Sequence, residues 1–97
     1  HASLIPHNFI SPLLTAATTH LDMSIPNCAL QEHCLWDEEP PGNELLKVPL
    51  KREAGYMLPP EAPGLGVEVN EEFLKKYPFK PGRPSAPLHR DGSVAVH

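Results

Sequence analysis

The sequence is poor in cysteine and in basic residues, and each shortage removes a class of protein. Two cysteines, Cys28 and Cys34, are too few for a disulfide framework, so we expect two reduced thiols. Eight lysines and arginines, without a cluster and at a formal net charge of −4, give no electrostatic footprint for nucleic acid or an anionic membrane surface. Nucleic acids and membranes are therefore excluded as leading partners.

Long apolar runs are also missing. No stretch approaches the roughly 20 apolar residues that span a bilayer. The sequence does not begin with a basic segment followed by a signal-type apolar run, and it contains no internal repeat. With 97 residues and 40% apolar content, one small domain is the ceiling. We expect a cytoplasmic protein.

Proline, by contrast, is abundant. Thirteen prolines stand against six glycines, and most of the prolines lie between residues 40 and 87. Proline interrupts long helices and central strands because it lacks a backbone N–H and fixes its own φ angle. The second half of the chain is therefore expected to be mostly loops and short elements.

The first half has the pattern of a strand, a helix and a strand. A short apolar run at residues 2–6 ends in proline, as a buried strand would, and residues 27–32 form a second such run. Between them, Ser11 and Pro12 are a strong helix start, and the helix should run from about Pro12 to Ser24. This is the βα unit of a parallel sheet, and one such unit cannot bury itself.

Burial within this unit can also be predicted. Leu14, Ala17, Leu21 and Ile25 recur at spacings of three and four, which favours one apolar stripe facing the core. Strand alternation places Cys28 within a core.

The second half contains weaker signals. Residues 33–43 are acidic and rich in proline, which predicts a loop of about ten residues, a length typical of a functional loop or a cover. A β-hairpin is plausible with arms at Val48–Leu50 and Tyr56–Leu58. Asn70 should cap a helix of about two turns. After Phe79 we expect an extended tail.

His7 and Glu32 each follow a predicted strand at its carboxyl end, the side on which parallel α/β proteins bind ligands. A neutral histidine there can accept a proton, and a carboxyl can hydrogen-bond an oxygen that gathers charge. The alternative is that His7 merely bonds to its turn and that Glu32 is solvated. His20 and His89 have no metal-ligand partner at a regular spacing, so we take both as structural or solvated.

Three other motifs carry alternative hypotheses. Cys28, His33 and Cys34 could bind zinc, although the set lacks paired short spacings and a fourth ligand. The glycines in PGLG, residues 63–66, could cradle a phosphate, but a turn with close backbone approach explains them better. The P-x-x-P spacing in PFKPGRP, residues 78–84, could fill an aromatic groove, or the tail could cover its own protein.

Four blocks resemble one known family. IPHNFISPLLTAATTHL, NCALQE, PGLGVEVNEEFLKKYP and PLHRDGSVAVH are similar to the C-terminal portion of acid-sugar dehydratases in the enolase superfamily, of the mandelate racemase/muconate lactonizing type and nearest the galactonate dehydratases. The resemblance implies an α/β fold: residues 1–42 would be the C-terminal end of a modified TIM barrel, with its last two strands and a connecting helix. Residues 43–97 would be a proline-rich segment that packs toward a capping domain absent from this chain.

The resemblance also implies a chemistry. In such enzymes Mg²⁺ holds the substrate carboxylate, a base removes the adjacent proton, and the enediolate expels the 3-hydroxyl as water. His7 matches the base, and Glu32 matches the carboxyl that hydrogen-bonds the substrate carboxylate or enediolate. Asn8 and Trp36 are candidates for substrate binding, and Trp36 could be either a wall of the site or an anchor for its loop.

Several parts of that machinery are absent from the sequence. The family's magnesium ligands, the aspartate that orients the base and the histidine that acts as acid come from earlier strands, so we expect the chain alone to be inactive and the tautomer of His7 to be unfixed. The implied partners are a sugar acid, the remainder of the enzyme and further copies in a homo-oligomer. The alternative reading is a proline-rich interaction or structural fragment without catalysis.

Overall fold

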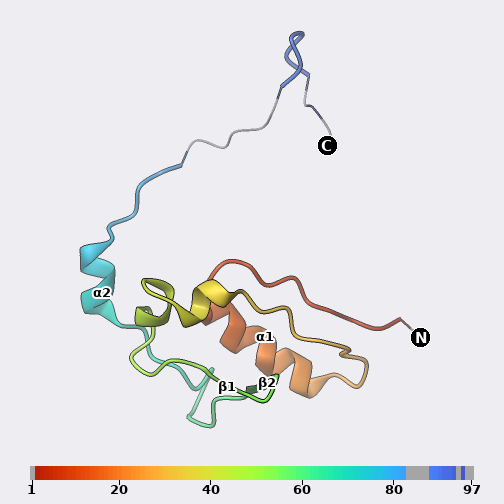
Figure 1. The fold of residues 1–97 in the computed structure, drawn as a ribbon, viewed down its shortest axis with the longest axis vertical. Coiled ribbons are helices and arrows are strands. Elements are labelled where there is room, and N and C mark those ends of the chain that lie inside the picture. The colour runs from red at the N-terminus through yellow and green to blue at the C-terminus, as the bar shows by residue number, and fades with distance from the viewer. Residues whose placement is uncertain (1, 83–87, 94, 96–97) are drawn as a thin grey trace.

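The computed structural model describes residues 2–82, 88–93 and 95 and shows a small α/β arrangement (Figure 1). Within these residues, two α-helices, two short 3₁₀ helices and one β-hairpin are joined by irregular segments. In chain order they are α1 (Pro12–Ser24), η1 (Leu35–Glu38), η2 (Gly42–Glu44), β1 (Lys51–Glu53), β2 (Tyr56–Leu58) and α2 (Glu71–Lys76).

The helix α1 has the predicted bounds because both of its ends are fixed by local chemistry. The Ser11 hydroxyl accepts a hydrogen bond from the N–H of Leu14 at 3.4 Å, and Pro12 occupies the first helical position. At the other end, the N–H of Ile25 donates to the carbonyl of Leu21 at 3.2 Å. The following residue, Pro26, cannot continue the helix.

The buried face of α1 differs from the expected apolar stripe. Leu21 is 45% exposed, whereas Thr15, Ala16, Thr18 and Thr19 are buried. The hydroxyls of Thr18 and Thr19 donate to carbonyl oxygens four residues earlier in the helix, at 3.0 and 2.7 Å. Because these polar atoms are satisfied within the helix, the threonines can be buried. The predicted stripe is therefore wrong.

The two segments read as strands lie side by side and parallel, but they pair at one point only. Leu4 and Cys28 form a parallel bridge, in which the N–H of Leu4 donates to the carbonyl of Asn27 and the N–H of Ala29 donates to the carbonyl of Leu4, both at 2.9 Å. The next bond of this ladder would need an N–H from Pro6, which has none. The predicted parallel arrangement is confirmed. The prediction of full strands at residues 2–6 and 27–32 is wrong, because only the bridge between Leu4 and Cys28 forms.

Both segments remain largely exposed. Leu4 and Leu30 are 42% and 66% exposed, and Cys28 is only half-buried. Parallel strands become buried when both of their faces are covered, which one helix cannot do. The expected core position of Cys28 is therefore wrong, while both thiols are free as expected.

The hairpin is present with a shifted first arm. β1 pairs with β2 in antiparallel register, with Glu53 opposite Tyr56. Ala54 and Gly55 both have positive φ angles, 50° and 83°, so two residues suffice for the turn. A two-residue turn places the first arm at Lys51–Glu53 instead of Val48–Leu50.

A second small cluster joins α2 to the middle of the chain. Leu46 is 3% exposed and forms an antiparallel bridge with Val69, and Phe73 is 9% exposed. Asn70 caps α2 as predicted, because its side chain accepts a hydrogen bond from the N–H of Phe73 at 3.3 Å. In the described part of the chain, neither helix is long and apolar enough to cross a membrane.

Beyond α2 the chain leads away from the other elements (Figure 1). Residues 88–93 include a turn in which the N–H of His89 donates to the carbonyl of Ser93 at 2.8 Å. The P-x-x-P motif at 78–84 runs into residues 83–87, which lie outside the described residues, as do parts of the expected extended tail.

Candidate functional site

The two candidate catalytic side chains meet at the ends of the paired segments. His7 and Glu32 follow the bridge residues Leu4 and Cys28 in the same direction of the chain. Nδ1 of His7 lies 2.6 Å from Oε2 of Glu32, across a separation of 25 residues. Parallel pairing thus brings both side chains to one edge, as the sequence predicts.

The contact fixes the tautomer of His7. Hydrogen bonds from the Asn8 backbone N–H and from His7 hold the pKa of Glu32 below its usual range, so this carboxyl is ionised at neutral pH. An ionised carboxylate only accepts hydrogen bonds, so Nδ1 of His7 is the donor in this contact. In a neutral imidazole with this hydrogen bond, Nε2 is the nitrogen that has the lone pair. Glu32 thus supplies a hydrogen-bond partner for Nδ1 in a chain that lacks the orienting aspartate.

The imidazole is the open member of the pair. The side chain of His7 is 82% exposed and that of Glu32 is 40% exposed. The ring of His7 is thus accessible in this portion of the enzyme, and a proton-abstracting base needs such access.

Asn8 is buried behind the pair of His7 and Glu32 and bonds to Glu32 and to Thr15. Its backbone N–H donates to Oε2 of Glu32 at 2.5 Å, and its side chain is 1% exposed. Nδ2 donates to Oγ1 of Thr15 at 2.8 Å and to the backbone carbonyl of Glu32 at 3.0 Å. The side chain points inward and bonds to the segment that carries Glu32. A role of Asn8 in substrate binding stays a prediction.

Three further polar residues extend this network, and sequence reasoning missed them. The Thr15 hydroxyl donates to Oδ2 of Asp37 at 2.5 Å. The side-chain amide of Gln31 donates to Oγ1 of Thr18 at 3.0 Å and to the carbonyl of Glu32 at 2.8 Å. The available signal was the run of threonines on α1, which a purely apolar stripe leaves unexplained.

Trp36 lies in η1 and is 57% exposed. A Cβ added at Gly42 would lie 2.8 Å from Cδ1 of Trp36 and closer still to its backbone oxygen, so only glycine fits there. This contact between η1 and η2 favours the hypothesis that Trp36 anchors its loop. A role as a wall of the substrate site stays a prediction.

The loop that carries Trp36 is joined to the hairpin by charge. Arg52 donates to Glu38 through Nε at 2.5 Å and through Nη2 at 2.9 Å, and His33 lies 2.8 Å from the same carboxylate. The Arg52 guanidinium lowers the pKa of Glu38 to about 2, with a further contribution from His33. Arg52 therefore ties β1 to the segment that follows the candidate site.

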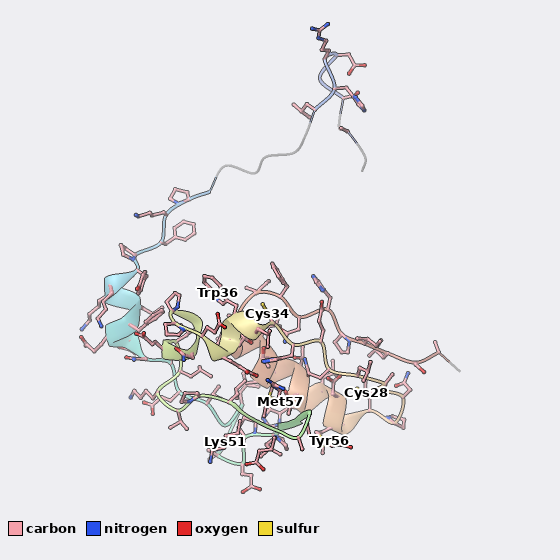
Figure 2. All side chains as sticks on the ribbon, viewed as in Figure 1. Cys28, Cys34, Trp36, Lys51, Tyr56 and Met57 are labelled. Carbon is pink, nitrogen blue, oxygen red and sulfur yellow. The ribbon has the colours of Figure 1, made fainter. Side chains whose placement is uncertain are left out.

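The structure also tests the metal hypotheses. In the part of the chain that it describes, no three or more histidine, cysteine, aspartate or glutamate side chains come together as a possible metal site. Cys34 lies beside η1 and Cys28 lies near the far end of α1 (Figure 2), so the zinc hypothesis with His33 is wrong. Partial burial and the neighbouring Asp22 raise the pKa of the Cys28 thiol, which opposes the thiolate form that zinc needs.

The PGLG motif is a turn, as expected. Gly64 and Gly66 have φ angles of 70° and 71°, and the N–H of Gly66 donates to the carbonyl of Pro63 at 3.2 Å. A Cβ at Gly66 would lie 2.5 Å from Cβ of Pro60. His20 lies 3.0 Å from the carbonyl oxygen of Leu65 and so joins α1 to this turn, a structural contact.

Comparison with protein families gives one match that covers most of the chain. Residues 1–73 match the family described as enolase C-terminal domain-like. A D-galactonate dehydratase from Ralstonia nicotianae is 35% identical over 96% of this chain and 26% of its own length. A D-galactonate dehydratase family member from Streptomyces bingchenggensis is 34% identical over 88% of this chain and 20% of its own length.

Solved structures agree with this match. A mandelate racemase/muconate lactonizing enzyme-type protein from Burkholderia SAR-1 superposes with a TM-score of 0.75 at 29% identity, over 97% of this chain and 25% of that one. An enolase of the mandelate racemase subgroup from Agrobacterium tumefaciens superposes with a TM-score of 0.63 at 28% identity, over 76% of this chain and 19% of that one. The chain thus spans only about a fifth to a quarter of the length of its curated relatives.

Proposed function

The chain belongs to the enolase C-terminal domain-like family, and we propose that it is the C-terminal portion of a magnesium-dependent sugar-acid dehydratase. The observation that carries the proposal is the contact between His7 and Glu32, with Nδ1 and Oε2 2.6 Å apart at the edge formed by two parallel segments. Relatives at about 35% identity are named as dehydratases of galactonate and mannonate, which supports a polyhydroxy acid as the substrate class.

In this proposal His7 is the base. Nε2 takes the proton from the carbon next to the substrate carboxylate, and the electrons of that C–H bond form an enediolate. The enediolate then forms a double bond between C2 and C3 as the C3–O bond breaks, and the hydroxyl leaves as water with a proton from an acid outside this chain. The resulting enol tautomerises to a 2-keto-3-deoxy acid.

Glu32 supports this step in two ways. Its negative charge beside Nδ1 stabilises the imidazolium that forms when Nε2 gains a proton. Oε2 is shared by His7 and the backbone N–H of Asn8, so Oε1 is the oxygen available to a substrate hydroxyl. The role that the family resemblance implies, a hydrogen bond from Glu32 to the substrate carboxylate or enediolate, requires that Glu32 first gain a proton. The carboxylate accepts a hydrogen bond from a substrate hydroxyl, and it can donate one only when protonated.

The family resemblance implies magnesium, and the described residues of this chain do not form a site for it. The proposal therefore assigns the metal ligands, the orienting aspartate and the acid to the remainder of the enzyme. It also assigns residues 1–42 to the barrel and residues 43–97 to the segment that contacts the capping domain, in a cytoplasmic homo-oligomer. The 97 residues alone should be inactive.

The test begins with the intact protein. Its measured mass should correspond to roughly four times this length, because matched relatives are four to five times longer. Incubated with Mg²⁺ and a panel of six-carbon sugar acids, it should release a 2-keto-3-deoxy acid from at least one. It should also exchange the C2 proton of that acid with solvent deuterium.

A native chain of only 97 residues would overturn the proposal. So would an intact protein that binds sugar acids but never exchanges the C2 proton. The competing hypothesis, a proline-rich interaction fragment, rests on a motif that continues outside the described residues.

A further inference from the structure

A polar network runs from the loop after the candidate site back to Glu32. Oγ1 of Thr15 lies 2.5 Å from Oδ2 of Asp37 and 2.8 Å from Nδ2 of Asn8. Asn8 in turn contacts the backbone carbonyl of Glu32 through Nδ2 and its carboxylate through the backbone N–H. Asn8 and Thr15, at the centre of the network, are 1% and 0% exposed and are therefore shielded from water.

The chemistry of the groups gives the network one direction. Asp37 only accepts, so the single hydroxyl hydrogen of Thr15 points toward it, although the carbonyl of Ser11 also lies 3.3 Å away. Oγ1 of Thr15 must then accept from Asn8, which leaves the second Nδ2 hydrogen for the carbonyl of Glu32. The flipped amide would place Oδ1 against two acceptors, so only the present orientation lets the amide donate both of its hydrogens. In this orientation Oδ1 is buried and has no hydrogen-bond partner among the described residues.

We propose that Thr15 and Asp37 are positioning residues for the pair of His7 and Glu32. They lock the Asn8 side chain, and the locked side chain aims the backbone N–H of Asn8 at Oε2 of Glu32. Because His7 is the residue directly before Asn8, the same lock sets the course of the backbone that carries the base. The inference rests on the proposed function, since it concerns how the proposed base and its carboxylate are held.

The variants are made in the intact enzyme with Mg²⁺ present. Thr15→Val keeps the shape of the side chain and removes the hydroxyl, Thr15→Ser keeps the hydroxyl, and Thr19→Val removes a buried hydroxyl that contacts only the carbonyl of Thr15. Thr15→Val should lower kcat by about 10- to 100-fold with a smaller change in KM, because small displacements of reacting groups are costly. Thr15→Ser should recover most of kcat, and Thr19→Val should resemble the wild type.

The titration of Glu32 gives a second readout that a general loss of stability would not move. The hydrogen bond from the N–H of Asn8 is the main cause of the lowered pKa of Glu32. In Thr15→Val that bond is looser, so the pKa of Glu32 should rise, which an NMR titration of its ¹³C-labelled carboxyl carbon measures directly. Asp37→Ala should also raise the pKa of Glu32, because it removes the acceptor of the Thr15 hydroxyl. Asp37→Asn keeps an acceptor oxygen and should raise that pKa less.

An activity-independent measurement separates this inference from the proposed function. In protein labelled with ¹⁵N-asparagine, the side-chain hydrogens of Asn8 should exchange slowly with solvent, and faster in Thr15→Val and Asp37→Ala. If the wild type has no dehydratase activity but this pattern holds, the proposed function fails and the network stands.

If the wild type is active, and Thr15→Val or Asp37→Ala matches Thr19→Val in kcat and in the pKa of Glu32, the positioning role is overturned. Asp37 lies in η1 rather than in α1, so its variants keep the test decisive even where Thr15→Val does not fold.

Discussion

Nδ1 of His7 lies 2.6 Å from Oε2 of Glu32, and the two residues come from the ends of adjacent parallel segments. The carboxylate accepts the Nδ1 hydrogen and thereby leaves Nε2 as the basic nitrogen. In this chain the pair forms without the orienting aspartate that the family resemblance places on an earlier strand. The Glu32 carboxylate is thus held by the backbone N–H of Asn8 and directed toward His7.

Replacing His7 should remove the proton-transfer step. His7→Asn keeps a polar side chain at an exposed position but has no basic nitrogen, so exchange of the C2 proton should fall by at least about 100-fold, at the low end of what a general base supplies. The measurement is deuterium incorporation at C2, followed by NMR in the intact enzyme. His20→Asn, on α1 and bonded to Leu65, is the matched control and should retain exchange. Exchange retained in His7→Asn would exclude His7 as the base.

Replacing Glu32 should affect turnover more than binding. Glu32→Gln keeps the size of the side chain and one acceptor oxygen but removes the charge that stabilises the imidazolium form of His7. kcat should fall by about 10- to 100-fold, with a smaller change in KM, because the lost interaction grows as charge develops. Steady-state kinetics with the same sugar acid measure both constants. Glu53→Gln, exposed on β1, serves as control, and an equal loss in KM alone would contradict the role.

Local sequence signals predicted α1 well because its ends depend on neighbouring residues. Ser11 and Pro12 start the helix and Pro26 stops it whatever surrounds it. Its buried face was mispredicted because burial depends on what packs against the helix. The threonine face is buried through bonds from Thr15 to Asn8 and Asp37, which lie in two other segments.

In the candidate site, too, some features follow from the sequence pattern and others depend on contacts between distant segments. The positions of His7 and Glu32 follow from the strand–helix–strand pattern, because parallel neighbours bring their carboxyl ends together. The bond between Nδ1 and Oε2 does not follow, since it requires the backbone of Asn8 to hold the carboxylate. The family resemblance even argued against a fixed tautomer, because it assigned the orienting role to another residue.

Glu38 should make a pH-dependent contribution to stability. Its folded-state pKa of about 2 lies below the unfolded value, so the contribution is complete above about pH 5 and is lost as the pH falls toward 2. Glu38→Gln should lower the free energy of unfolding at pH 7 by about 1 kcal/mol or less, since partly exposed ion pairs are screened. The difference from wild type should shrink at pH 3. Urea unfolding at both pH values checks this.

The matched control for Glu38 is Glu72→Gln. Glu72 pairs with Lys75 on α2 at 2.5 Å, and its side chain is 77% exposed. That variant should be nearly neutral at both pH values. A Glu38→Gln effect of equal size at pH 7 and pH 3 would show that the carboxylate charge is not what joins the loop to β1.

Gly66 and Gly64 should separate backbone strain from steric contact. Both have φ near 70°, so an alanine at either position should cost about 1–2 kcal/mol from the left-handed backbone alone. At Gly66 the added Cβ would also lie 2.5 Å from Cβ of Pro60, whereas nothing lies within 4 Å at Gly64. Overpacking should add about 1–3 kcal/mol, so Gly66→Ala should be clearly less stable than Gly64→Ala in urea unfolding. Equal losses would mean that Gly66 is required for its φ angle and not for the approach of Pro60.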